Sequence, residues 1–185
     1  MTRVSEGTSP PFRGVDEPHP GEAAHASGRA GSVVSLMSAH PARLSNLVGT
    51  ELVGEEWLTI DQGRIDAFAG ATSDFQWIHV EPERAAAGPY GATVAHGYLT
   101  LSLIPVLTEG ILDLGDVGAI VNYGLDRVRF IQPVVVGSRL RARSEVTAVE
   151  ESGQGYRVAL RVTIEIEGSE RPALVADTIA LLVPA

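Results

Sequence analysis

The sequence predicts an α+β domain in which one buried helix packs against a curved antiparallel sheet. The C-terminal third alternates apolar and polar residues in successive segments, as strands with one wet face do. An apolar run over 98–111 has the length of a buried helix rather than a strand. At 185 residues the chain has room for one such core and an appendage.

The N-terminal segment, residues 1–40, is rich in Gly, Pro, Ser, Ala and His and has no sustained periodicity. This composition buries too little apolar surface to offset the entropy lost on ordering, so we expect a disordered tail. We place the folded domain at 41–185. Three histidines, His19, His25 and His40, lie in the tail or at its edge, where we expect solvated side chains rather than metal ligands.

The domain is expected to begin with a strand over 57–60, followed by a helix with Asp61 as its N-cap. That helix presents four residues on one face: Ile65, Phe68, Ala69 and Thr72. Residues 73–97 have no clear period, and their prolines and glycines indicate a long structured loop.

The segment 98–111 fits two patterns. Alternate leucines over 99–103 suit a strand, whereas a helix groups four side chains on one face: Leu99, Leu103, Val106 and Leu107. Length and apolar character favour a buried helix, which Pro105 is expected to bend.

Four further strands are expected to form a consecutive antiparallel meander. They cover 121–130, 139–149, 156–167 and 174–183. Hairpin turns are expected at 152–155 and 168–170, where glycine and serine gather.

Composition excludes several kinds of chemistry. A net charge of -9 argues against nucleic acid binding through a basic face. The chain has no cysteine, which excludes a thiolate nucleophile and a zinc–thiolate site, and all 14 basic residues are arginine, which excludes a Schiff-base lysine. The longest apolar stretch, 98–107, is about half the ~20 residues of a membrane-spanning helix. We expect a cytoplasmic protein without membrane contact.

One short region carries groups suited to acid–base catalysis. Asp74 and His79 lie five residues apart, and Gly97 opens the apolar helix. A carboxylate and an imidazole can share one water molecule, while the free N–H at a helix start can polarise a carbonyl. Apolar neighbours make the surroundings partly dry: Phe75, Trp77 and Ile78. His96, directly before the glycine, is expected to shape the turn.

The segment FAGATSDFQWIHVEPERA, residues 68–85, resembles the hydratase motif of MaoC-like (R)-specific enoyl-CoA hydratases, in the branch that includes nodulation protein N-like proteins. Three more stretches carry the resemblance: AAGPYG at 86–91, AHGYLTLSL at 95–103 and NYGLDRVRF at 122–130. It covers about residues 42–184.

The resemblance implies a hot-dog fold, in which a long central helix lies in a curled antiparallel sheet, and a homodimer. It implies syn hydration of trans-2-enoyl thioesters to (R)-3-hydroxyacyl thioesters, with Asp74 and His79 holding the water and the Gly97 N–H polarising the thioester carbonyl. The substrate would be an acyl-CoA or an acyl-carrier-protein thioester, with no metal and no separate cofactor. Which of Asp74 and His79 acts as base stays open.

The motif departs from the family pattern at two places. Many members have Gly-Asp-x-Asn-Pro before the histidine, whereas this chain has Ser73 for the glycine and Gln76-Trp77 for Asn-Pro. The serine is the more unusual change and bears on the turn that aims Asp74.

Further candidates for substrate binding are Gln76, Ser102, Asn122, Gly124, Arg84, Arg127 and Arg129. The glutamine would bond the water or orient the histidine, and the serine would support the aspartate. The asparagine and the glycine would line the acyl site, and the arginines would bind CoA phosphates or a carrier phosphopantetheine. A purely structural role is the alternative for each.

Three other functions stay open at this point. They are a dehydratase acting on carrier-bound polyketide intermediates, a hot-dog acyl-CoA thioesterase, and a non-catalytic acyl-binding accessory protein. The five-residue Asp–His spacing favours hydration over thioester hydrolysis.

Overall fold

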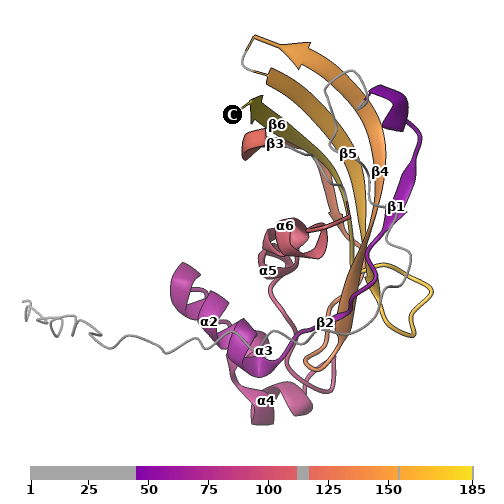
Figure 1. The fold of residues 1–185 in the computed structure, drawn as a ribbon. Helices are drawn as coiled ribbons and strands as arrows, with labels where there is room; N and C mark the ends of the chain where they lie inside the picture. The colour runs from indigo at the N-terminus through magenta and orange to yellow at the C-terminus, as the bar shows by residue number, and fades with distance from the viewer. Residues whose placement is uncertain (1–44, 112–116, 154, 185) are drawn as a thin grey trace, which may run out of the picture. The chain divides into compact units, whose positions relative to one another are not determined.

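The computed structural model describes residues 45–111, 117–153 and 155–184, which belong to one compact unit, Ser35–Ala185 (Figure 1). The expected tail, its three histidines and the predicted start of the domain lie outside the described residues. No helix in the described part of the chain has the length and apolarity needed to span a membrane.

The helices are short apart from α2. Their bounds are η1 Ser45–Leu47, α2 Gln62–Thr72, α3 Trp77–Val80, α4 Pro82–Ala86, α5 Gly97–Ser102 and α6 Ile104–Leu107. Asp61 caps α2 as predicted, because its carboxylate accepts a hydrogen bond from the N–H of Arg64 at 2.8 Å. Ile65 and Ala69 are buried, whereas Thr72 is exposed. The loop expected over 73–97 contains α3 and α4.

The strands form one antiparallel sheet. Their bounds are β1 Glu51–Val53, β2 Leu58–Thr59, β3 Val117–Phe130, β4 Arg139–Ser152, β5 Gly155–Ile166 and β6 Leu174–Pro184. The order is β1-β4-β5-β6-β3, and β2 also pairs with β4. All five predicted strands are present, the first of them shortened to β2, while β1 was not predicted.

The predicted meander is correct for β4, β5 and β6 but wrong for β3. β3 pairs with β6 at the far edge of the sheet instead of with β4. The chain between β3 and β4 is bonded to the segment that precedes α5: Ala95 N–H donates to Val134 O at 2.8 Å, and Val136 N–H donates to Thr93 O at 2.9 Å. These bonds replace the tight hairpin that a meander requires.

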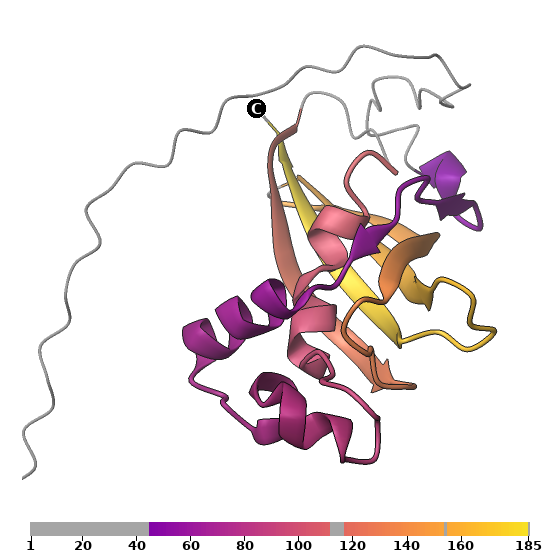
Figure 2. The same cartoon turned by 90° about the horizontal axis from the view of Figure 1, so that it is seen from below.

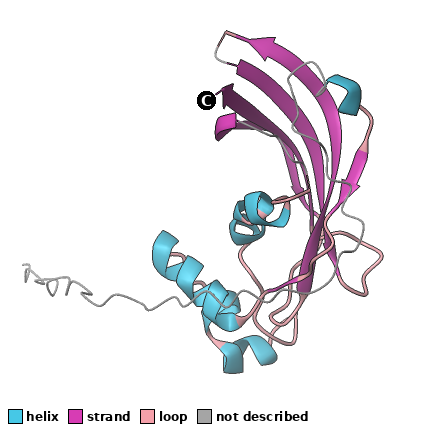
Figure 3. Cartoon of the chain, in the orientation of Figure 1, coloured by secondary structure: helices cyan, strands magenta, loops and turns pink. Residues whose placement is uncertain are grey.

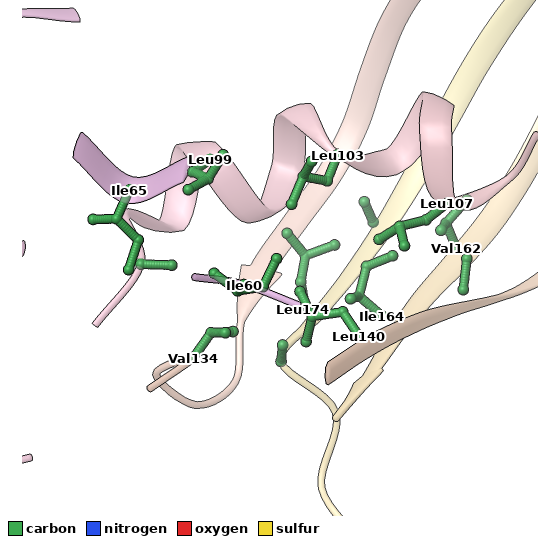
Figure 4. Packing of buried hydrophobic residues seen from close by; sticks show 14 residues of the cluster. Ile60, Ile65, Leu99, Leu103, Leu107, Val134, Leu140, Val162, Ile164 and Leu174 are labelled. Atoms are coloured by element: carbon green, nitrogen blue, oxygen red, sulfur yellow. The ribbon is translucent and has the colours of Figure 1, made fainter. Parts of the chain in front are cut away.

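The helix expected over 98–111 is present as α5 and α6, which lie on the concave side of the sheet (Figures 1 and 3). Leu99, Leu103 and Leu107 are buried in the same core as residues of β4, β5 and β6 (Figure 4). The interruption at Leu103 agrees with the bend expected from Pro105, which has no N–H to donate to the preceding turn. Val106 is 50% exposed, so its expected place on the buried face is wrong.

This arrangement confirms the α+β class and the hot-dog fold that the resemblance implied. α2, α3 and α4 lie together at one side of α5 (Figures 1 and 2). The loop that carries Asp74 lies beside the start of α5, since Nε2 of His96 is 2.9 Å from Asp74 O.

Candidate active site

The fold brings together the two polar residues singled out in the sequence and adds a third. Asp74 follows the end of α2, His79 lies in α3, and His96 is the N-cap residue of α5. One carboxylate oxygen of Asp74 and one ring nitrogen from each histidine lie within 4.8 Å of one another. Asp74 is exposed, whereas both histidines are buried.

The turn before Asp74 depends on Ser73. This residue ends α2 in the left-handed region, with φ 60° and ψ 24°, and is the one non-glycine residue with positive φ among those described. Glycine adopts this conformation without steric cost, and serine does not. Glycine, which the family pattern has at this position, would make this turn without that cost, whereas Ser73 makes it under strain.

His79 is oriented by the backbone. Its Nδ1 lies 2.6 Å from the carbonyl oxygen of Val94. Because a carbonyl only accepts hydrogen bonds, Nδ1 carries the ring proton, and Nε2 of the neutral ring keeps its lone pair. The α3 backbone is held in turn by Gln62, whose side-chain amide donates to His79 O at 2.8 Å.

The pKa of His79 is lowered from its usual value of 6.5. Burial is the largest cause, since it disfavours the charged ring, and the neighbouring His96 lowers the pKa as well. The hydrogen bond to Val94 O and the charge of Asp74 act in the opposite direction without cancelling the effect. At neutral pH the ring is therefore uncharged and able to accept a proton at Nε2.

His96 was missed as a site residue. Its Nε2 lies 2.9 Å from the backbone oxygen of Asp74, and its ring stacks on that of His79 with centroids 3.7 Å apart and 25° between the planes. The Phe68 ring also lies against that of His96, with ring centroids 5.1 Å apart and 50° between the planes. In the sequence, only the position of His96 directly before Gly97 indicated a role for it. The stack could not be predicted, because it joins two segments that are not neighbours in the chain.

The same three residues invite comparison with a metal site, but their geometry does not suit one. A metal ion lies in the plane of each imidazole that binds it, at about 2.0–2.1 Å from the nitrogen. Two rings stacked 3.7 Å apart at 25° have planes that do not meet at such a distance. Both histidines therefore cannot bind one ion without leaving the stack.

Gly97 is the first residue of α5, where a helix N–H has no partner in its own helix. A Cβ built on this residue would lie 3.2 Å from two ring carbons of Phe130 on β3. That distance is tighter than most packing contacts, so a side chain at this position would require the Phe130 ring to move by a few tenths of an ångström. α5 is only six residues long, so the feature of interest is the N–H itself rather than a helix dipole.

A cavity of about 710 Å³ lies between α5–α6 and the sheet, with mostly apolar walls. Ser102, Asn122 and Gly124 are among the residues that line it. The expected support of Asp74 by Ser102 is not observed, because the serine hydroxyl donates to Tyr98 O in its own helix at 2.7 Å.

The other candidates are not among the described residues that line this cavity. Gln76 is exposed at the N-cap position of α3, where its side chain makes no capping bond. Arg84 packs over the Trp77 ring, 4.7 Å from its centroid. Arg127 and Arg129 are exposed on β3, and none of these three arginines is among the described residues that line the cavity.

Comparison with known proteins identifies the family. A family model described as a MaoC like domain matches residues 43–167. 3-hydroxyacyl-thioester dehydratase Z from Mycobacterium tuberculosis is 48% identical over 139 residues, covering 75% of this chain and 92% of the relative. Nodulation protein N from Rhizobium leguminosarum bv. viciae is 46% identical over 144 residues, covering 76% of this chain and 89% of the relative.

A solved structure agrees with these matches. The (R)-hydratase from A. caviae involved in PHA biosynthesis superposes with a TM-score of 0.61 at 26% identity, covering 73% of this chain and 96% of that protein. The family match spans more than half of the chain, and the same region carries the site described above. The chain therefore belongs to the MaoC-like domain family.

Proposed function

We propose that the protein is a hydro-lyase that interconverts trans-2-enoyl thioesters and (R)-3-hydroxyacyl thioesters. The observation that carries this proposal is the convergence of the Asp74 carboxylate and the His79 ring close to the helix start at Gly97. The names of the relatives, a hydroxyacyl-thioester dehydratase and an (R)-hydratase, support the same reaction class.

The chemistry needs one water and one proton acceptor. We assign Nε2 of His79 as the acceptor, because Nδ1 is committed to Val94 O. Asp74 accepts the second hydrogen of the water and so aims its oxygen. The oxygen bonds to C3, the water proton passes to Nε2, and His79 then delivers that proton to C2. One water is added overall, and both new bonds form on the same face of the alkene.

Negative charge moves to the thioester oxygen while C3 is attacked. The N–H of Gly97 is the donor we assign to that oxygen. In other enzymes, removing one hydrogen-bond donor to a developing oxyanion lowers kcat by roughly 10²–10³. Acid–base help from a positioned side chain contributes about 10²–10⁴. Both effects are needed for an alkene that water alone attacks slowly.

The acyl chain would occupy the cavity beside α5–α6, because its walls are mostly apolar and it is large enough for a long chain. Asn122 and Gly124 would contact the chain there. Exposed Arg84, Arg127 and Arg129 stay the candidates for the phosphates of CoA or of a carrier phosphopantetheine.

We further propose a homodimer that covers the β3 edge. β3 ends the strand order, so one of its edges is unpaired within the described sheet. Several large apolar side chains on it are exposed: Ile120, Val121, Tyr123, Leu125 and Phe130. A long apolar edge strand readily pairs with another chain. Sedimentation of the purified protein at several concentrations tests this, and a monomer throughout would contradict it.

Turnover of enoyl thioesters tests the reaction. Crotonyl-CoA and longer enoyl thioesters, on CoA and on carrier protein, should lose their enoyl absorbance and yield the (R) alcohol on chiral analysis. Asp74→Asn and His79→Gln should each lower kcat at least 100-fold. Arg139→Gln, which alters an exposed ion pair with Glu167, is the matched control and should keep full activity.

A thiol-trapping reagent in the same assay separates hydration from hydrolysis, because only thioester hydrolysis releases free CoA. Thiol release without hydration would indicate a thioesterase. If wild type and Asp74→Asn are equally inert on every thioester, the proposed reaction is wrong, and tight binding without turnover would indicate an acyl-binding protein.

A further inference from the structure

His96 joins the parts of the site that the reaction would need together. It directly precedes Gly97, its Nε2 lies 2.9 Å from Asp74 O, and its ring stacks on His79 at 3.7 Å. The carbonyl of Asp74 can only accept, so Nε2 of His96 donates this bond. The side chain of this buried residue thus contacts the Asp74 backbone and the His79 ring, and the residue directly precedes the start of α5.

We propose that His96 is a positioning residue that ties the Asp74 loop to the start of α5 and holds the His79 ring by stacking. This role rests on the proposed hydration. His96 transfers no proton in it. Its function is to keep the carboxylate, Nε2 of His79 and the Gly97 N–H in mutual alignment while a substrate binds.

A role in packing alone does not account for this residue. Nδ1 of His96 is buried and has no hydrogen-bond partner among the described residues. Burying an unpaired polar atom destabilises the folded protein. Phenylalanine would fill the same space against Phe68 without that cost, but it would leave Asp74 O without its donor. Nor does His96 cap α5, because its side chain makes no capping bond.

The stack also affects the protonation of His79. The titratable groups that act on the His79 ring are Asp74, which raises its pKa, and His96, which lowers it. Replacing His96 by a side chain that does not titrate removes one of the causes that lower the pKa of His79. The acid limb of the pH–rate profile should then move to higher pH.

Two substitutions separate the contacts of His96. His96→Gln can keep an amide N–H near the Nε2 position but removes the ring, and His96→Phe keeps a ring but removes the donor. We expect each to lower kcat by roughly 10- to 100-fold with KM changed less than threefold, because small misplacements of catalytic groups have effects of this size. His96→Asn, with a shorter side chain, should recover neither contact and be slower than His96→Gln.

A second measurement needs neither a variant nor activity. Ring-nitrogen NMR of the wild-type protein with isotopically labelled histidine reports each tautomer directly. We expect His96 to carry its proton on Nε2 and His79 to carry its proton on Nδ1. A proton on Nδ1 of His96 would mean that the bond to Asp74 O is absent, and this would overturn the proposal even if every variant failed to fold.

The outcomes also separate this proposal from the proposed reaction. Absence of turnover by the wild type would contradict hydration, while the tautomers and the His79 titration would still test the contacts of His96. If the wild type is active and both variants keep kcat within twofold with an unchanged acid limb, His96 is not a positioning residue.

Discussion

The hydrogen bond between His79 Nδ1 and the carbonyl oxygen of Val94, 2.6 Å long, decides which nitrogen of the catalytic candidate is free. Val94 is only two residues before His96, so the segment that orients one imidazole also supplies the ring that stacks on it. The His79 ring and the groups that orient it therefore belong to one connected unit around α3 and the start of α5.

The first prediction concerns pH. Because the pKa of His79 lies below 6.5, its neutral form persists at and somewhat below that pH. Activity that needs neutral His79 should therefore have an acid limb centred below about pH 6.5. The pH dependence of kcat/KM checks this. An acid limb centred above 6.5 that is absent in His79→Gln would contradict the lowered pKa.

The lowered pKa of His79 also affects the free energy of unfolding. Between the folded pKa and about 6.5 the unfolded chain binds a proton that the folded protein does not, so stability should rise with pH across this window. Urea unfolding at several pH values measures the slope. His79→Gln should remove this part of the slope, and an unchanged slope in that variant would assign it to other groups.

Ser73→Gly should stabilise the protein by about 0.5–1 kcal/mol, because a left-handed conformation is strained for serine and natural for glycine. Ala67→Gly is the matched control at an exposed position inside α2 and should destabilise by about 1 kcal/mol. Urea unfolding measures both changes. A loss of stability in Ser73→Gly would show that the serine side chain contributes more than its backbone strain removes.

Gly97→Ala should lower kcat roughly 10- to 100-fold, since its Cβ would press on Phe130 and shift the N–H at the start of α5. Phe130→Leu removes the ring that the new Cβ would contact. The double variant should therefore recover part of the lost rate. A double-mutant cycle on kcat makes the comparison, and strict additivity would exclude this contact as the cause.

The face of the sheet opposite the helices carries an ion cluster of Arg141, Arg143 and Glu165, with Arg143 also paired to Glu51. Burial alone would raise the pKa of Glu165, but hydrogen bonds from the two arginines bring it below its usual value of 4.5. The ionised Glu165 therefore stabilises the folded protein above about pH 4.5, and this stabilisation is lost as pH falls through the lowered pKa of Glu165.

Glu165→Gln should destabilise the protein by about 1 kcal/mol at neutral pH and by less in acid or high salt, because these groups are partly exposed. Glu145→Gln, on the same face of β4 and without an ion pair among the described residues, is the control and should change little. Thermal unfolding at neutral and acid pH compares them. Equal effects of the two substitutions would contradict the ion cluster.

Local patterns in the sequence predicted much of the fold. Asp61 is a cap because its carboxylate bonds an N–H three residues away, and Ile65 and Ala69 are buried because helical spacing places them on one face. The strands β4, β5 and β6 follow from alternation and short turns. Each of these depends on neighbours close in the chain, which the sequence shows directly.

The placement of β3 and the interrupted helix depend on contacts over longer distances. β3 was predicted as a strand like the others, but its partner is β6 because the connection after it is bonded to the segment before α5. β6 is not adjacent to β3 in the chain, so periodicity carries no information about this pairing. The arginines predicted to bind phosphate are likewise placed by the fold, at exposed positions that are not among the described residues lining the cavity.

The sequence by itself determined the family resemblance, the chemical groups of the site and the strands that build the sheet, because residue identity, spacing and alternation are local properties. Only the tertiary structure decided that Nε2 of His79 is the free nitrogen, that Ser73 makes a glycine-like turn, and that His96 stacks within the site. The tautomer and the stack arise from contacts between α3 and the segment before α5. The turn is a backbone conformation that residue identity alone does not reveal.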